Sequence, residues 1–266
     1  MINWPLYKQG IKTNFKLFLV FIAILTLYTT MVISMFDPKL AETLEEFFRI
    51  MPDVMSMMGM NGDVTNLNSF IVTYLYGFIF IVFPMIFSII LVNKLIISHI
   101  DRGSMSYLLA STNSRQKIIV TQLKVIGTYL FVLILYSTVL SIITCQLMFP
   151  NELNVLSFFI LNIGVLIFHY VLNGIGFLAS CVFNDAKNAL LIGIGFPIMF
   201  FIIQMLVNMG GKLEKFKYIT LFTLFDAMGL INRMTPAYYG IAILLIIAIV
   251  LYGTGIIIFK KRDLSV

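Results

Sequence analysis

The sequence predicts an all-α integral membrane protein with six transmembrane helices. Of its 266 residues, 60% are hydrophobic and only 11% are charged, whereas soluble proteins contain about 45–50% apolar and about 25% charged residues. The mean hydropathy is +1.00. One membrane-spanning helix needs about 20 apolar residues, and apolar runs fill most of the chain. This composition excludes a soluble globular protein, and the 25 phenylalanines exclude a disordered one.

Six apolar runs without acidic residues define the predicted spans. They are residues 17–36, 70–92, 119–148, 155–181, 189–208 and 237–259, in a single transmembrane domain over residues 1–266. The third run is longer than a bilayer requires, and it carries Lys124 near one end. We therefore expect its first turns to project into the cytoplasm or to tilt.

The distribution of charge predicts that both termini are cytoplasmic. This orientation places 12 of the 18 Lys and Arg residues inside and nine of the 12 Asp and Glu residues outside. Cytoplasmic loops of membrane proteins carry an excess of Lys and Arg. The segment 209–236 fits least well, because it would hold four basic residues outside. Since the basic residues flank spans and do not cluster on a compact domain, they indicate membrane topology and no nucleic-acid partner.

Residues 1–16 are predicted to form an amphipathic interfacial helix in the plane of the membrane. Apolar and basic side chains repeat here at helical spacing, and Pro5 suits a first helical turn. The apolar face holds Trp4, Tyr7, Ile11 and Phe15, and the basic residues beside it are Lys8, Lys12 and Lys16. The alternative is a simple basic flank of the first span without a defined helix.

Two long segments are predicted to form helices on the outer surface. In residues 37–69, apolar residues at helical spacing precede five methionines in ten residues, among them Met55 and Met58. Flexible thioethers make adaptable apolar contacts, so this segment either touches a hydrophobic substrate or packs on lipid as an interfacial lid. Residues 209–236 are rich in aromatic side chains, which predicts helices that return to the outer interface.

The inner connection, residues 93–118, carries the most specific pattern. A glycine break at Gly103 is followed by a short amphipathic piece, a Ser/Asn turn and basic residues, which predicts a helix that meets a cytosolic partner. The run Arg102-Gly103-Ser104, with Leu108-Leu109 and Ser114-Arg115 after it, resembles the first cytoplasmic loop of type 2 ABC (ATP-binding cassette) exporter permeases. Residues 51–60, 216–226 and 259–264 resemble further motifs of that family in the same order, although Asn113 stands where the family usually has proline.

This resemblance implies a permease subunit of the bacterial cytoplasmic membrane, in a branch that exports peptides, toxins or drugs. The ATPase would be a separate subunit that binds ATP and Mg, with no cofactor in this chain. A second permease copy or a paralogue would complete the complex in membrane lipid. The ATPase would dock on the N-terminal helix and on a coupling loop formed by Asp101, Arg102, Gly103, Ser104, Tyr107, Leu108, Leu109 and Arg115.

Polar residues inside the spans are candidates for a substrate path, because they are costly in lipid and face protein or water. In the fourth span, Asn162, His169 and Asn173 share one helical face with Gly176 and Ser180. The third span adds Ser137 and Ser141, and the fifth adds Gln204. These residues either line a path together with Met55 and Met58, or form interhelical hydrogen bonds. His169 is accordingly either a proton site or a hydrogen-bonded packing residue.

The sequence offers no motif for catalysis or metal binding in this chain. The nearest approach to a P-loop, Gly211-Lys212, has leucines at the required first-glycine and Ser/Thr positions. The two histidines and two cysteines lack metal-ligand spacing. No span contains a carboxylate, which disfavours a proton- or sodium-coupled carrier. We therefore expect no catalytic residue and no metal site.

The function favoured by these observations is ATP-driven export of an amphipathic or hydrophobic peptide, such as a toxin or bacteriocin. Export of drugs, lipid or sodium is an alternative within the same class. A membrane sensor or immunity protein that binds a toxin without transporting it is an alternative from another class. The presence of an ATPase partner distinguishes the two classes.

Overall fold

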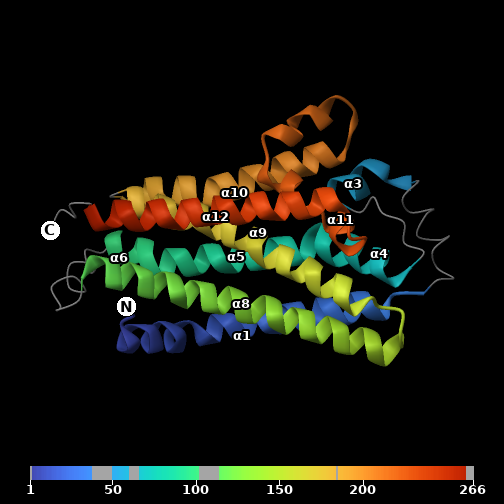
Figure 1. Ribbon diagram of the computed structural model, residues 1–266, viewed down its shortest axis with the longest axis horizontal. Helices are drawn as coiled ribbons and strands as arrows, with labels where there is room; N and C mark the ends of the chain where they lie inside the picture. Colours follow the sequence, from blue (N-terminus) through green and yellow to red (C-terminus); the bar gives the residue numbers. More distant parts are fainter. Residues whose placement is uncertain (1, 38–49, 60–65, 102–113, 184, 262–266) are drawn as a thin grey trace.

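Six long apolar helices form most of the computed structural model, which describes residues 2–37, 50–59, 66–101, 114–183 and 185–261. The helices run along the longest axis of the molecule (Figure 1). Within these residues there is no strand. The segments long and apolar enough to cross a membrane are Trp4–Ser34 (α1), Leu67–Ile97, Arg115–Met148 (α8), Val155–Val182 (α9), Ala186–Asn208 (α10) and Thr235–Lys261 (α12). The predicted all-α membrane fold is confirmed.

The second span is divided by two stretches of wider π-helix. Its parts are α4 (Leu67–Ile71), η2 (Val72–Ile79), α5 (Phe80–Val92) and η3 (Asn93–Ile97), and the short α6 (Ser98–Asp101) follows. Pro84 lies inside α5. Proline has no N–H to donate to the carbonyl four residues earlier, so the Phe80 carbonyl loses its usual helical partner. The regular α-helical part that contains Pro84 therefore lies between the two π-helical stretches, and its first carbonyl needs a partner from outside the helix.

The predicted separate in-plane helix at residues 1–16 is wrong in one respect, because α1 is a single uninterrupted helix from Trp4 to Ser34. Its first turns pack on the extended beginning of α8. Tyr7 Oη and Thr128 Oγ1 are 3.0 Å apart, and the Tyr129 hydroxyl donates to the Ile11 carbonyl. Tyr7 and Ile11 of the amphipathic face therefore contact a protein neighbour, and the helix continues without interruption into the span.

Helix α9 forms the centre of the bundle. Of its 28 residues 17 are buried, whereas only three of the 23 residues of α10 are. It packs against α12, α10, α5 and α8. Gly176 of α9 meets Gly193 of α10 so closely that a Cβ on Gly193 would lie 3.0 Å from the Gly176 Cα. Any polar side chain on α9 is consequently placed where several helices can reach it.

Short helices cover the end of the bundle opposite the start of α1. They are α3 (Pro52–Met57), η4 (Gly211–Tyr218), η5 (Leu221–Leu224) and α11 (Ala227–Ile231), with η4 and η5 in 3-10 geometry. The expectation that residues 209–236 form helices at the outer surface is confirmed. The apolar helix expected before the methionines falls mainly on residues 38–49, which lie outside the described residues.

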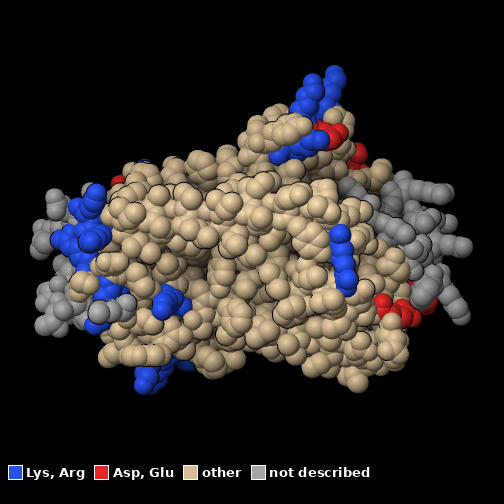
Figure 2. Space-filling model, in the orientation of Figure 1, with Lys and Arg blue, Asp and Glu red and all other residues tan. Residues whose placement is uncertain are grey.

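The first helix begins and the last helix ends at the same end of the molecule (Figure 1). Basic side chains gather at that end, and acidic side chains are visible at the other (Figure 2). By the positive-inside rule the basic end is cytoplasmic. We call it the inner end and its opposite the outer end.

Candidate functional site: the outer cavity, the α9 stripe and the inner end

A cavity of about 290 Å³ lies at the outer end between η2, α3, α10, η5 and α11. We call it the outer cavity. Its lining is mostly apolar and aromatic, with a minority of polar groups. The apolar residues are Met57, Val72, Ile81, Phe201, Met205, Phe222, Phe225, Ala227 and Met228; the polar residues are Thr73, Tyr76, Gln204, Asn208 and Asp226; and two glycines, Gly59 and Gly77, complete it. Such a mixture suits an amphipathic ligand.

Two glycines let the methionine segment lie directly on the second span. A Cβ on Gly77 would come 2.7 Å from the Met58 carbonyl oxygen, so only glycine permits this contact between η2 and the end of α3. Gly59 follows with φ +74°, a left-handed conformation that glycine adopts without steric cost. Together they close one wall of the outer cavity.

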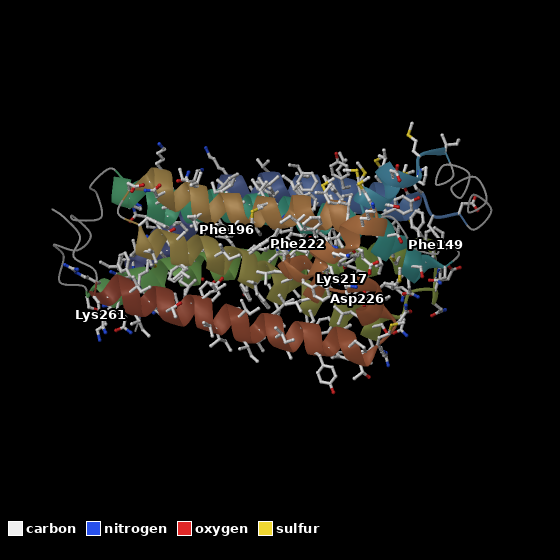
Figure 3. The ribbon with its side chains drawn as sticks, turned by 90° about the horizontal axis from the view of Figure 1, so that it is seen from above. Phe149, Phe196, Lys217, Phe222, Asp226 and Lys261 are labelled. Atoms are coloured by element: carbon white, nitrogen blue, oxygen red, sulfur yellow. The ribbon has the colours of Figure 1, made fainter. Side chains whose placement is uncertain are left out.

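The opposite wall is held by hydrogen bonds and aromatic contacts within residues 200–229. Gln204 Nε2 donates to Asn208 Oδ1 at 2.8 Å. The Asp226 carboxylate caps α11 by accepting from the Gly229 N–H at 2.8 Å. Phe222 packs on Phe201 with ring centroids 5.7 Å apart. Figure 3 shows Phe222 deeper in the bundle than Asp226, which lies nearer the end marked by Phe149.

The predicted polar stripe of α9 is buried and engaged by neighbouring helices. Asn162 Oδ1 accepts from the Tyr76 hydroxyl at 2.9 Å, and Asn173 Oδ1 lies 3.0 Å from the Tyr252 hydroxyl oxygen. His169 Nε2–H donates to the Phe80 carbonyl at 2.8 Å. Ser180 Oγ donates to the Gly176 carbonyl of its own helix at 2.7 Å. These contacts support the interpretation of the stripe as interhelical packing.

His169 compensates the proline of the second span. The Phe80 carbonyl is the group that Pro84 cannot reach as a donor, and it accepts from the His169 ring. Because a carbonyl only accepts, the ring is protonated on Nε2. The hydrogen-bond partner of His169 is thus a backbone carbonyl in another helix that lacks its usual donor. The sequence of the fourth span alone does not reveal this partner.

The serines expected to line a path on α8 are satisfied within their own helix. Ser137 Oγ donates to the Leu133 carbonyl at 3.0 Å, and Ser141 Oγ donates to the Ser137 carbonyl at 2.8 Å. Both side chains are buried. They therefore belong to helix packing in the single chain.

Comparison with known proteins gives one family. The family described as ABC-2 family transporter protein matches residues 8–264, which is nearly the whole chain. The chain belongs to the ABC-2 transporter family. None of the curated proteins and none of the solved structures compared with this ABC-2 permease matches it. Family membership together with six apolar spans makes the chain a multi-pass membrane subunit of an ABC transporter in the cell membrane, with an ABC ATPase subunit as its partner.

The inner end of this ABC-2 permease holds the segment predicted for coupling. Asp101 is the last residue of α6, and Arg115 is the first residue of α8. The Ser114 hydroxyl caps α8 by accepting from the Lys117 N–H at 3.3 Å. The remaining coupling-loop residues lie outside the described residues; they are Arg102, Gly103, Ser104, Tyr107, Leu108 and Leu109.

The first turns of α1 present a charged, exposed surface beside this segment. Trp4 and Phe15 are exposed, and Tyr7 and Ile11 are half-buried against α8. The basic side chains on this part of the helix, Lys8, Lys12 and Lys16, are all exposed. The inner end of the permease therefore combines an exposed basic helix face with the ends of α6 and α8.

Of the residues predicted for the outer part of a path, Gln204 lines the outer cavity. Met55 and Met58 are not among its described lining residues, although their neighbour Met57 is. Sequence reasoning missed Tyr76, Phe225 and Asp226. The signal available for the last two was their place in the aromatic segment 216–226, which resembles a motif of the permease family.

Proposed function

We propose that this permease is the membrane-spanning subunit of an ATP-driven exporter of amphipathic or hydrophobic peptides of the toxin or bacteriocin kind. The outer cavity carries the proposal. Its aromatic and methionine walls offer adaptable apolar contacts, and its few polar groups would orient a polar end of the cargo. Its place at the outer end between helices suits cargo on its way out.

The energy for transport is proposed to come from a separate ATPase subunit. That subunit would bind ATP and Mg, and it would dock on residues 93–118 and on the first turns of α1. Two copies of the permease, or one copy with a paralogue, would surround the path. The exposed basic face of α1 and the position of Arg115 at the start of α8 support this docking.

The first experiment is to solubilise membranes that contain the tagged permease and to identify the co-purified proteins by mass spectrometry. An ATPase in about 1:1 ratio with the permease is expected. The double variant Arg102→Ala, Leu108→Ala should insert in the membrane and lose this partner. Purification of the wild-type chain alone in several mild detergents, or an intact complex with normal transport in the double variant, would contradict the docking proposal.

The cargo is tested with the reconstituted complex. Amphipathic peptides should stimulate ATP hydrolysis, because occupied cargo sites favour the transport cycle. Gly77→Ala should reduce this stimulation, since its Cβ would displace the Met58 backbone from η2. Gly195→Ala is the matched control, because a Cβ there meets nothing within 4 Å. Stimulation by small drugs alone would refute the peptide proposal and leave the ATPase partner unaffected.

A further inference from the structure

A second cavity opens on the side of the bundle between α8, α9 and α12, with a volume of about 680 Å³. We call it the lateral groove. Residues that line it include Lys124 and Thr128 of α8, Tyr170 of α9, and Leu245, Ile249 and Tyr252 of α12. Figure 2 shows this face, which is hollowed between α12 and α8 and uncharged over most of its length. Because α8 and α12 are membrane spans, the groove faces the bilayer.

The polar groups of the groove walls are bonded within the protein. The Tyr170 hydroxyl donates to the Gly127 carbonyl at 3.2 Å, and the Tyr252 hydroxyl donates to the Tyr170 carbonyl at 2.8 Å. Thr128 Oγ1 lies 3.0 Å from Tyr7 Oη. The walls therefore present mainly aliphatic and aromatic surface, which suits a hydrocarbon chain.

Lys124 places one cation at the inner part of this groove. Its side chain is exposed, and it lies nine residues beyond the start of α8 at Arg115, which is about 13 Å along the helix axis. Lys217 pairs with Glu214, and among the described residues no carboxylate forms an ion pair with Lys124. A lysine that faces lipid is costly, by up to about 3 kcal/mol at the membrane centre.

The spans of a second permease copy would not supply the missing counter-charge. None of the six apolar runs in the sequence contains Asp or Glu, so the spans of another copy packed against the groove would bring no carboxylate to Lys124. The inner leaflet, in contrast, supplies phosphate groups close to this depth, and anionic lipids attract Lys and Arg near the membrane surface.

We propose that the lateral groove is a binding site for an anionic phospholipid of the inner leaflet. The lipid phosphate pairs with Lys124, and an acyl chain lies along Leu245, Ile249 and the Tyr252 ring. The bound lipid bridges α8, which begins at the coupling segment, and α12. This site is separate from the outer cavity, and its occupancy does not depend on the identity of the cargo.

The test uses purified permease that is stripped of lipid and then exposed to phosphatidylglycerol or phosphatidylcholine with identical acyl chains. Native mass spectrometry measures the lipid retained by each protein molecule. Phosphatidylglycerol should be preferred about five-fold, the ratio that corresponds to about 1 kcal/mol for one lysine near anionic lipid. Lys124→Gln should abolish the preference.

Two further variants distinguish lipid binding in the lateral groove from a general attraction of anionic lipid to the basic inner end. Lys117→Gln removes a half-buried cation from the same helix, two turns nearer the inner end and outside the groove lining, so the preference should remain. Gly127→Leu fills the groove, since a Cβ there already approaches the Tyr170 ring to 3.9 Å, and it should lower retention of both lipids. Thermal unfolding of each variant confirms that it is folded.

Four results would overturn the proposal. Equal retention of both lipids by the wild-type protein would show that the lipid charge does not contribute to binding. If Lys124→Gln keeps the preference for phosphatidylglycerol, or if Lys117→Gln loses it to the same extent, Lys124 does not define a lipid site. A disulfide-linked dimer formed in membranes by Leu245→Cys would show that a second copy covers the groove, because the native Cys145 and Cys181 are buried.

Discussion

His169 of α9 replaces a backbone hydrogen bond that Pro84 of α5 cannot make, and this side-chain hydrogen bond joins the two helices. The proline removes the donor for the Phe80 carbonyl, and the His169 ring donates to that carbonyl at 2.8 Å. An unsatisfied carbonyl inside a membrane span costs several kcal/mol. The histidine thus has a structural reason to be present at membrane depth, and the alternative of a proton site is not needed to explain it.

We predict that His169→Leu lowers stability by about 1–3 kcal/mol, the usual cost of a buried acceptor that is left without its donor. In a Pro84→Ala background the restored N–H can bond to Phe80, so the same substitution should cost clearly less. Thermal unfolding of the four proteins in detergent measures this difference. An equal loss in both backgrounds would mean that His169 acts through packing alone.

A second pair at the same scale is the hydrogen bond from Tyr76 to Asn162. Tyr76→Phe removes the donor and leaves the Asn162 oxygen buried, so we expect a loss of about 1 kcal/mol. Tyr74→Phe is the matched control, because its half-buried ring packs at a tilt on Phe70 and keeps that contact without the hydroxyl. Comparable losses of melting temperature in both variants would contradict the assigned role of the Tyr76 hydroxyl.

At the scale of elements, sequence reasoning located the spans better than their packing. Every predicted span lies within or nearly within a helix of the structure, because a run of apolar residues is needed to cross a bilayer. The burial of α9 and the exposure of α10 could not be foreseen, since lipid and protein interior are equally apolar. For the same reason Gln204 is the only predicted path residue among the described residues that line the outer cavity, and the methionine segment contributes Met57 in place of the predicted Met55 and Met58. Its other residues come together through contacts between distant helices.

The close contact of α9 with α10 gives a prediction about helix packing. Gly193→Leu should force the helices apart and lower stability by about 1–3 kcal/mol, the usual cost of overpacking. Gly195→Leu, two residues along the same helix, adds a side chain where nothing lies within 4 Å, and it should leave the melting temperature nearly unchanged. Equal effects of the two variants would show that helix propensity, and not the contact with Gly176, dominates.

At the scale of the whole molecule, the two ends differ in charge, and the sequence already predicted this difference. Lysine and arginine mark the end where α1 begins and α12 ends (Figure 2). The prediction that failed at this scale was a helix of residues 1–16 separate from the first span, because α1 is continuous. Amphipathic periodicity shows that a helix has an apolar face, but it does not say whether lipid or another helix covers that face. Here α8 partly covers Tyr7 and Ile11 of that face, and Trp4 and Phe15 stay exposed.

The orientation predicts which lysines are accessible from outside. Lys212→Cys, on η4 at the outer end, should react with a membrane-impermeant maleimide in intact cells. Lys117→Cys, at the inner end, should react only after the membrane is made permeable. The native cysteines are buried and give little background. Reversed labelling of the two variants would place the basic end outside and overturn the assigned orientation.

The union of α1 with α8 has a mechanical consequence. The Tyr7–Thr128 contact and the Thr26–Tyr136 contact, with hydroxyl oxygens 3.0 and 2.7 Å apart, join the two helices at widely separated levels. Neither helix is broken, and α8 alone is about 50 Å long. Two rods fixed together at several points resist bending far more than either rod alone. A tilt of about five degrees imposed at Arg115 would therefore reach the outer end as a sweep of about 4 Å over that length, so that the pair acts as a lever across the membrane.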